Sequence, residues 1–363
     1  MIRIAIVGLG KMGLSHLAMI RVHPGVQLAG VCDTSRYLLD VLDKYTGVAT
    51  FTDYETMLNQ AKPEAIIIAT PSRFHAKMAR MALERGLHVF SEKPFCLNPE
   101  DSLDLASLAA KNRLVNQVGY HYRFVGAFQE VKRLLESGAI GPVSHVLAEA
   151  YGPVVLRPKG LSWRTQKEEG GGCLYDYAAH PVNLLNWFFG MPDRVSSTVV
   201  SSIFSKNTDD EVYCAISFPS GPNAQLSVNW SDESQRKMSV RMTLRGMTGQ
   251  IIANRQECRV FLGNSAQIPP GYTKGWNIRY TTELTQPVWF YLRGEEYSAE
   301  LDHFVRCITS DEHTIVNPFA SAAETDRTLA LMQQDAQVTA TLIAATHDAR
   351  LSQGFAARPA ARA

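Results

Sequence analysis

Short apolar runs, often β-branched, recur through the first 120 positions, and each run stops at a glycine, an aspartate or a polar turn. Runs of this kind are typical of strands that are buried on both faces, as in a parallel sheet. Helical stretches separate the runs, and this alternation predicts a doubly wound α/β domain. The runs are Ile2–Val7, Val26–Cys32, Ala65–Ala69, Leu87–Phe90 and Leu114–Val118, and the helical stretches include Phe74–Arg85 and Pro99–Asn112.

The pattern changes after about residue 120. A helix over Ala127–Ser137, ended by Gly138, is followed by strand-like stretches that turns separate. This series predicts a large, mostly antiparallel open sheet rather than further βαβ units. Two helices close the chain, one with an apolar core stripe from Tyr297 to Ile308 and one over Ala320–Ala344. The predicted strands are Val143–Tyr151, Arg194–Ser202, Val212–Phe218, Gln225–Trp230, Met238–Arg245, Gly249–Ala253 and Arg259–Leu262.

A length of 363 residues fits two domains. With 45% hydrophobic and 20% charged residues, the composition is that of an ordinary folded chain with sizeable cores. We expect an N-terminal domain over residues 1–120, a C-terminal α+β domain over residues 121–350, and a flexible tail over residues 351–363.

Charge and cysteine usage exclude several classes of protein. The net charge of +1 gives no support to a nucleic-acid partner. The chain has no apolar run long enough for a membrane span, and its N-terminus has no secretory pattern. Six cysteines are scattered singly without a CxxC pair, so we expect no metal site and no disulfide framework. These features predict a cytoplasmic enzyme.

A glycine-rich turn follows the first predicted strand directly. Gly8, Gly10 and Gly13 form a G-x-G-x-x-G motif, in which the first glycine permits a tight turn and the second a close approach of the backbone to a pyrophosphate. The third allows close packing of helix on strand. Asp33 ends the second strand, where a carboxylate binds the adenosine ribose. The motif therefore predicts dinucleotide binding by a Rossmann domain, with Lys11 and Met12 also against the cofactor.

The choice of dinucleotide depends on two neighbouring side chains. Asp33 repels a 2′-phosphate and favours NAD, whereas Arg36 can pair with one and leaves NADP possible. Thr70 and Pro71 follow a buried strand at the carboxyl edge of the sheet, where ligands collect, and His75 lies close by. We expect all three to contact the cofactor, although Pro71 also suits a simple strand terminator.

Glu92, Lys93 and Pro94 follow another buried strand. A lysine there faces the nicotinamide end of the cleft, where its ammonium can hold and polarise a substrate hydroxyl. A cis bond before Pro94 would set the direction of Lys93. By itself, a Glu-Lys pair is more often an ordinary surface turn.

A second constellation lies near the middle of the chain. Gly170, Gly171 and Gly172 precede Asp176 and His180, which are four residues apart and share one face if the segment is helical. Histidine exchanges protons near neutral pH, and a carboxylate one turn away can orient it. Pro181 weakens the helical argument, because proline disfavours a helical residue before it. On these residues alone, a capping aspartate and a core histidine are the better explanation.

Taken together, Gly8-x-Gly10-x-x-Gly13, Glu92-Lys93-Pro94 and Gly-Gly-Gly-x-x-x-Asp176-x-x-x-His180 resemble the Gfo/Idh/MocA oxidoreductases. That family includes inositol dehydrogenase and glucose–fructose oxidoreductase, and the resemblance extends over nearly the whole chain. It implies an NAD(P)-dependent dehydrogenase that acts on a secondary alcohol of a sugar, a cyclitol or a nucleotide sugar.

The resemblance also implies a role for each matching residue. Lys93, Asp176 and His180 match the family's catalytic set: His180 as general acid–base, Lys93 as hydrogen-bond donor to the reacting hydroxyl and the nicotinamide ribose, and Asp176 as orienting group. Glu92 and Lys93 also lie at the cofactor. The sequence departs from many members at Asn183, where they carry an aspartate.

Further candidates lie near these motifs. Tyr120, His121 and Arg123 follow the last Rossmann strand, and we expect Tyr120 and Arg123 to contact substrate, although hinge packing explains them equally well. Trp163 can stack on a sugar ring, and Arg164 can bind an anionic group. A loop-anchoring role is equally consistent with these two.

Two other classes of function remain open at this stage. One is a dinucleotide-binding regulator without catalysis, and the other is a glycosidase that recycles NAD on the same fold. We also expect a homo-oligomer, a dimer or tetramer, because an open sheet with apolar positions needs covering.

Overall fold

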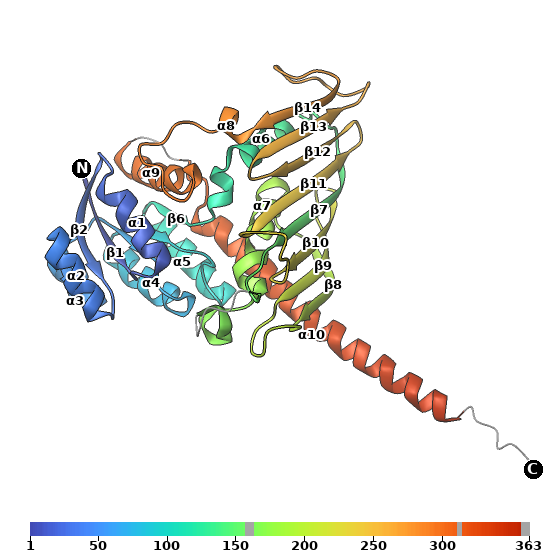
Figure 1. Ribbon diagram of the computed structural model, residues 1–363, viewed down its shortest axis with the longest axis horizontal. Coiled ribbons are helices and arrows are strands. Elements are labelled where there is room, and N and C mark those ends of the chain that lie inside the picture. Colours follow the sequence, from blue (N-terminus) through green and yellow to red (C-terminus); the bar gives the residue numbers. More distant parts are fainter. Residues whose placement is uncertain (157–162, 311–313, 357–363) are drawn as a thin grey trace, which may run out of the picture.

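The structure is a computed structural model that describes residues 1–156, 163–310 and 314–356, with side chains described to residue 341. Two sheets lie side by side in the molecule, and helices fill the space between them (Figure 1). Residues 351–356 of the predicted tail continue the last helix, and residues 357–363 lie outside the described residues.

The first sheet is parallel, with six strands in the order β3-β2-β1-β4-β5-β6. This order is that of the doubly wound dinucleotide-binding fold, and it confirms the predicted Rossmann sheet. The strands are β1 (Ile2–Val7), β2 (Val26–Cys32), β3 (Thr50–Phe51), β4 (Ala65–Ile68), β5 (His88–Ser91) and β6 (Asn116–Val118). The intervening helices are α1 (Lys11–Arg21), α2 (Arg36–Thr46), α3 (Tyr54–Ala61), α4 (His75–Glu84) and α5 (Pro99–Lys111).

The second sheet has eight strands in the order β14-β13-β12-β11-β7-β10-β9-β8. All neighbouring pairs are antiparallel except β7 and β10, which run parallel at the centre. The strands are β7 (Val143–Tyr151), β8 (Arg194–Ser201), β9 (Glu211–Ser217), β10 (Asn223–Asn229), β11 (Ser239–Gly246), β12 (Gly249–Asn254), β13 (Glu257–Leu262) and β14 (Gly275–Tyr280). The structure therefore confirms the mostly antiparallel sheet, and β14 is an addition to the prediction.

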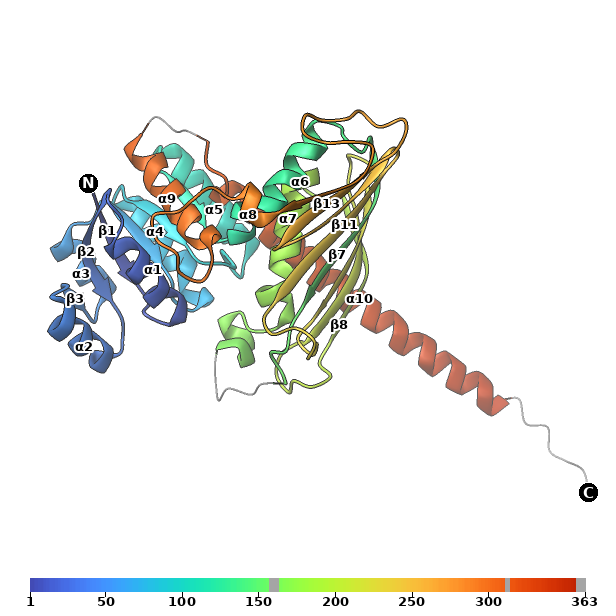
Figure 2. The ribbon, with the colours of Figure 1, turned by 45° about the horizontal axis from the view of Figure 1, so that its top comes forward.

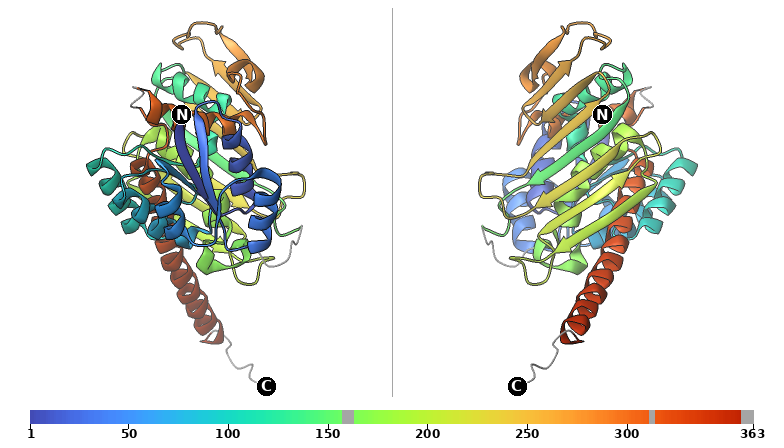
Figure 3. Two further views of the ribbon diagram at one scale, coloured as in Figure 1. Left: turned by 90° about the vertical axis from the view of Figure 1, so that its left-hand side faces the viewer. Right: turned by 90° about the vertical axis from the view of Figure 1, so that its right-hand side faces the viewer.

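Only one face of the second sheet is packed by the described part of the chain. Along β9, Val212, Cys214 and Ile216 are buried and alternate with more exposed positions, as expected for a half-buried strand. α6 (Gly126–Glu136), α7 (Ala179–Phe189) and α10 (Phe319–Ala356) lie on the side of the first domain (Figure 2). The opposite face is open to view across its strands (Figure 3).

The chain returns to the first sheet near its end. α9 (Glu295–Thr309) buries Leu301, Phe304 and Val305 in the same apolar cluster as Ile4 and Ile6 of β1. The predicted apolar stripe is therefore core. The division at residue 120 stays a prediction, but α9, from the predicted second domain, packs on the first sheet.

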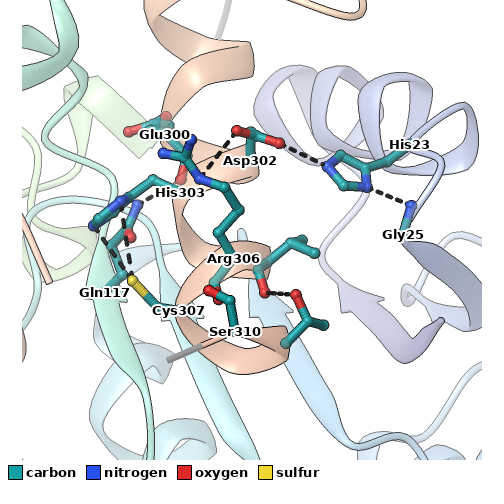
Figure 4. A network of polar contacts seen from close by, with 11 residues as sticks. His23, Gly25, Gln117, Glu300, Asp302, His303, Arg306, Cys307 and Ser310 are labelled. Atoms are coloured by element: carbon teal, nitrogen blue, oxygen red, sulfur yellow. Dashed lines mark hydrogen bonds and ion pairs between the residues drawn. The ribbon is translucent and has the colours of Figure 1, made fainter. Parts of the chain in front are cut away.

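Polar contacts fix α9 against the turn that precedes β2 (Figure 4). The Gly25 N–H donates to Nδ1 of His23 at 3.0 Å, so this nitrogen carries no proton. Nε2 of His23 therefore carries the proton and donates to Asp302 Oδ1 at 3.2 Å. Arg306, one turn further along α9, contacts the other oxygen of Asp302 at 3.4 Å. This chain of contacts supplements the apolar packing of α9.

Candidate active site

The glycine turn between β1 and α1 has the shape that a pyrophosphate requires. A Cβ on Gly13 would lie 1.8 Å from the carbonyl oxygen of Gly8, so the helix packs on the turn with no space for a side chain. A Cβ on Gly10, by contrast, would meet nothing within 4 Å. α1 begins at Lys11 without a side-chain cap among the described residues, and its positive end is suited to phosphates. Met12 lies in the same first turn. These residues fit a bound dinucleotide.

Asp33 at the end of β2 is held by two backbone groups. Its Oδ2 accepts from the Leu9 N–H at 2.6 Å, and its Oδ1 accepts from the Ser35 N–H at 2.8 Å. Each carboxylate oxygen has a further lone pair, so the side chain can still accept from ribose hydroxyls. Arg36 is exposed at the start of α2. This arrangement fits the adenosine end of NAD.

Lys93 and Asp176 meet across the boundary between the two sheets. Lys93 lies just after β5, at the carboxyl edge of the first sheet. The Lys93–Pro94 peptide bond is cis. Its Nζ donates to Asp176 Oδ1 at 2.8 Å and to the Asp176 carbonyl oxygen at 2.9 Å. The pair was separated by 83 residues in sequence, and the fold brings the two predicted residues together.

A second cation contacts the same carboxylate. Nε of Arg164, from the short turn Trp163–Thr165, donates to Asp176 Oδ2 at 2.7 Å. Burial alone would raise the pKa of Asp176, but the charges and hydrogen bonds of Lys93 and Arg164 outweigh it and lower that pKa. Asp176 is therefore an ionised carboxylate with a cation at each oxygen.

His180 is close to this cluster in sequence, but no hydrogen bond joins it to Asp176 in the structure. Asp176 lies in a π-helical turn, Leu174–Ala178, and His180 is the second residue of α7. Pro181, the third residue of α7, stands inside a continuous helical run from Cys173 to Phe189 and follows the π turn closely, so it is not at a free helix start. The expected shared helical face is thus replaced by a π turn, a feature that is frequent at functional sites.

The imidazole of His180 is 2% exposed, and its Nδ1 has no hydrogen-bond partner among the described residues. Burial, and then the positive charge of Lys93, hold its pKa well below the usual value. His180 is therefore neutral at neutral pH and able to accept a proton.

Aromatic rings from the segment after β6 surround His180. The ring centroids of Tyr120, His121 and Tyr122 lie 6.1, 5.0 and 5.1 Å from that of His180. His121 also stacks on Tyr297 of α9, with centroids 4.4 Å apart. Three separate parts of the chain therefore meet around this histidine.

Two further predicted cofactor residues hold the loops of the site. Glu92 accepts from Nε2 of the buried His16 on α1 at 2.7 Å and from its neighbour's backbone, the Lys93 N–H, at 3.2 Å. His75 contacts the carbonyl oxygens of Thr70 and Pro94, each at 2.9 Å. It thereby joins the loops after β4 and β5, while Pro71 is exposed at the start of the turn Ser72–Phe74. Direct contact of these residues with the cofactor stays a prediction.

The predicted substrate residues divide into two groups. Arg123 is 2% exposed, and its guanidinium donates to Asn183, Val316 and Ser321, which ties the site to α7 and α10. Tyr120 is 1% exposed. Trp163, by contrast, lies under the guanidinium of Arg164, 4.6 Å from the ring centroid to the carbon of that group. Substrate contact by these residues also stays a prediction.

Sequence reasoning missed three contacts that define the site: His16 with Glu92, Arg164 with Asp176, and Tyr297 with His121. Each joins residues from different elements, and no local spacing signals them. For one residue, His16, the sequence did offer a signal, because His16 lies on the helix that follows the glycine motif.

Two family models match consecutive parts of the chain. One, described as an oxidoreductase family with an NAD-binding Rossmann fold, matches residues 2–120. The other, described as the GFO/IDH/MocA C-terminal domain, matches residues 128–252. Fold and family models thus define a member of an oxidoreductase family with an NAD-binding Rossmann domain, which confirms the predicted cofactor NAD. The chain belongs to the Gfo/Idh/MocA oxidoreductase family.

Individual relatives differ in how much of the chain they match. The chain is 30% identical to D-glucoside 3-dehydrogenase of Escherichia coli (strain K12) over 53% of its own length and 55% of that protein. It is 25% identical to scyllo-inositol 2-dehydrogenase (NAD(+)) of Bacillus subtilis (strain 168), over 87% and 88% of the two chains. The chain thus spans about half the length of the first curated relatives that it matches.

Solved structures confirm the fold. Levoglucosan dehydrogenase, in complex with NADH and levoglucosan, superposes with a TM-score of 0.80 at 22% identity, over 93% of this chain and 98% of that one. The WlbA dehydrogenase from Bordetella pertussis, in complex with NADH and UDP-GlcNAcA, superposes with a TM-score of 0.75 at 22% identity, over 93% of this chain and 96% of that one.

Within the described residues, the helices are too short or too polar to cross a membrane.

Proposed function

We propose that the protein transfers a hydride between NAD and a secondary alcohol of a sugar, a cyclitol or a nucleotide sugar. The observation that carries this proposal is the Lys93–Asp176 ion pair, with its Nζ to Oδ1 distance of 2.8 Å, beside the neutral His180. An ammonium and a neutral imidazole at the end of a dinucleotide-binding sheet are the groups that alcohol oxidation needs. Relatives named as glucoside and inositol dehydrogenases support the substrate class.

Lys93 has one proton left for the substrate. Its ammonium has three N–H donors, and two of them go to the carbonyl oxygen and the carboxylate of Asp176. The third can donate to the reacting hydroxyl and withdraw charge from its oxygen. Asp176 fixes the direction of Lys93, and Arg164 holds Asp176 from its other side.

His180 takes the proton of the hydroxyl in the oxidative direction and returns it in reduction. Its lowered pKa keeps the imidazole neutral, so it is ready to act as the base. The nicotinamide ring, when bound, accepts or donates the hydride. The chain supplies position through Lys93 and Asp176, and proton transfer through His180.

Binding and turnover test this proposal in one preparation. The protein is titrated with NADH and NADPH by fluorescence, and then assayed with NAD and scyllo-inositol, methyl α-D-glucoside, levoglucosan or UDP-N-acetylglucosamine at the nicotinamide absorbance band. We expect tighter binding of NADH and net reduction of NAD with one of these compounds. Tight binding without turnover on any polyol or nucleotide sugar would instead support a regulator. Cleavage of the glucoside without net NADH formation would support an NAD-recycling glycosidase.

We also propose that the open face of the second sheet pairs with a second copy of the chain. Strands β13 and β14 carry Phe261, Trp276, Ile278 and Tyr280, each between 38% and 50% exposed, and the strand register places all four on one face. Exposed large apolar side chains gathered on one face of a sheet are typical of a subunit interface. The six buried free cysteines suit the reducing cytoplasm, which we propose as the location.

Light scattering after gel filtration tests the proposed subunit interface. We expect a dimer or tetramer at micromolar concentration, and a smaller species when Ile278 is replaced by arginine. Tyr45→Arg, at a more exposed aromatic residue on α2, serves as the control. A monomer for the unmodified chain would contradict the proposal.

A further inference from the structure

The helix that carries Asp176 starts directly after the three glycines, and an aspartate from another part of the chain caps it. The chain is continuously helical over 173–189, so its first backbone N–H groups have no acceptor within the helix. The carbonyl oxygen of Asp209, just before β9, accepts from the Cys173 N–H at 2.9 Å, and Oδ2 of Asp209 accepts from the Leu174 N–H at 2.6 Å. Asp209 therefore serves two of these groups, in the way that an N-cap residue does.

Two of the glycines make this arrangement possible. Gly172 has a φ of +110°, and a Cβ on it would lie 2.3 Å from Oδ1 of Asp209, so a side chain here would displace the carboxylate. The Asp176 N–H donates to the carbonyl oxygen of Gly172 at 3.0 Å. A Cβ on Gly171 would lie 2.5 Å from the carbonyl oxygen of Arg164, whose side chain binds Asp176. The glycines thus let Asp209 and the turn of Arg164 pack closely on the start of the helix.

We propose that Asp209 is a positioning residue that sets Asp176, and through it Lys93, for the reaction, which rests on the proposed function. Leu174 is the first residue of the π-helical turn that includes Asp176, so the bond from Asp209 fixes where this turn begins. Nζ of Lys93 donates to the carbonyl oxygen of Asp176 as well as to its carboxylate. A rotation of the Asp176 side chain cannot restore the carbonyl contact once the backbone of the turn has moved. A misplacement of about 1 Å at a catalytic site can cost about a hundredfold in rate.

Three variants and one matched control test this role. Asp209→Ala removes the side-chain acceptor of the Leu174 N–H, whereas Asp209→Asn keeps one acceptor oxygen. Asp209→Glu keeps the carboxylate but adds a methylene group where the contact with Gly172 leaves no space. The control is Asp53→Ala, because Asp53 also caps a helix from its side chain, accepting from the Thr56 N–H at 2.7 Å at the start of α3. α3 lies beside β2 and β3, at the far edge of the first sheet (Figure 1).

The variants should separate the position of Asp176 from stability. With NAD and whichever of scyllo-inositol, methyl α-D-glucoside or levoglucosan the unmodified enzyme oxidises fastest, we expect kcat of Asp209→Ala to fall about tenfold or more. Asp209→Glu should also lower kcat, and Asp209→Asn should keep most of it. Asp53→Ala should lower Tm, as Asp209→Ala does, and keep its kcat. The Kd of NADH should stay the same in all four proteins.

Two results would overturn the positioning role. One is a loss of kcat in Asp209→Asn as large as that in Asp209→Ala, because the acceptor oxygen would then not matter. The other is an unchanged kcat in Asp209→Glu, which decides the question even if Asp209→Ala does not fold.

A double-mutant cycle tests whether Asp209 acts through Asp176. In Asp176→Asn the ion pair with Lys93 is already lost, so adding Asp209→Ala should lower kcat by less than about twofold. A further loss as large as that of Asp209→Ala alone would show that Asp209 acts by another route, and it would overturn the proposal.

The positioning role and the proposed function fail in distinguishable ways. If the unmodified protein oxidises none of these compounds, the ionisation of Asp176 still reports its position. Burial raises the pKa of Asp176, but the charges and hydrogen bonds of Lys93 and Arg164 outweigh it and hold that pKa below its usual value. Carbon-13 NMR of labelled aspartate carboxyls measures this pKa, with Asp176→Asn for the assignment. We expect the pKa to rise in Asp209→Ala or Asp209→Glu and to stay the same in Asp53→Ala. An unchanged pKa in the Asp209 variants would overturn the positioning role.

Discussion

Lys93 divides its ammonium protons between Asp176 and the substrate side of the site, and its charge also acts on His180. After burial, that charge is the cause that lowers the pKa of His180. In the proposed function, a single side chain thus polarises the hydroxyl and, together with burial, keeps the base neutral. The Glu-Lys-Pro motif predicted this residue from sequence, but its contacts with Asp176 are visible only in the fold.

Replacing Lys93 with methionine should therefore have two effects. We expect kcat for alcohol oxidation to fall about a hundredfold or more, because the hydroxyl loses its donor. In the unmodified enzyme we expect the acidic limb of the pH profile of kcat below pH 6.5. In the variant this limb should move to higher pH, because a raised pKa leaves His180 protonated at higher pH. Profiles from pH 5 to 9 measure both effects, with Lys77→Met on the exposed side of α4 as the control. An unmoved limb would contradict this electrostatic role.

At Asp33 the prediction concerns which dinucleotide binds. Asp33→Asn keeps one acceptor oxygen for the backbone groups of Leu9 or Ser35 but removes the negative charge. We expect NADH to bind several-fold more weakly and NADPH to lose less or to gain, because the repulsion of a 2′-phosphate disappears. Fluorescence titrations of both cofactors give the ratio. Equal losses for the two cofactors would show that Asp33 does not select the ribose.

At the scale of single elements, the start of α1 separates packing from binding. Gly10 and Gly13 belong to the same motif, yet a Cβ on Gly13 would lie 1.8 Å from a backbone oxygen and a Cβ on Gly10 would have open space. The motif predicted cofactor contact for both glycines without distinguishing their reasons. In the structure, Gly13 is required for the packing of the helix on the turn, and Gly10 leaves space for a ligand.

The two alanine variants should accordingly differ in kind. Gly10→Ala should change the free energy of unfolding by less than about 1 kcal/mol and weaken NADH binding about tenfold or more, because the methyl group occupies the phosphate space. Gly13→Ala should destabilise the fold by about 1–3 kcal/mol or more through overpacking. Thermal unfolding and NADH titration of both variants provide the comparison. Similar losses of stability would contradict it.

Most strands could be predicted from sequence because burial leaves a strong local pattern, as in the apolar run of β1. β14 could not, because its alternation places Trp276 and Ile278 on an exposed face and Asn277 between them. The parallel pairing of β7 with β10 is also absent from the pattern, since alternation defines a strand and not its partner. The π turn at Asp176 also has no signal in the residue spacing, which predicted an ordinary helical turn.

At the scale of the whole molecule, α10 fastens the end of the chain to the first domain. Asp326 on α10 accepts from the Ser102 hydroxyl on α5 at 2.6 Å and from the Cys96 N–H at 2.9 Å. Its other oxygen is buried without a partner among the described residues. Burial raises the pKa of Asp326 to about 7. The folded state thus retains a proton that the unfolded chain loses near pH 4.

This difference makes the stability of the fold depend on pH. Asp326 lowers the free energy of unfolding increasingly as pH rises from about 4 towards 7. In this range its carboxyl group ionises in the unfolded chain but stays protonated in the folded state. Asp326→Asn removes that cost, so its advantage should grow by about 2–3 kcal/mol between pH 5 and pH 8. The difference in Tm between variant and unmodified protein at the two pH values measures it. A difference independent of pH would contradict the assignment.

The return of α9 to the first sheet also sets an order of events during synthesis. Phe304 completes an apolar cluster that begins at Ile4 of β1, about 300 residues earlier. About 180 residues separate the end of the predicted first domain from α9, and a ribosome adds roughly 5–20 residues per second, so the nascent first domain waits roughly 10–40 s for this helix. During this interval the part of the sheet that α9 covers, beside α1, is exposed, and it is then a natural binding surface for a chaperone.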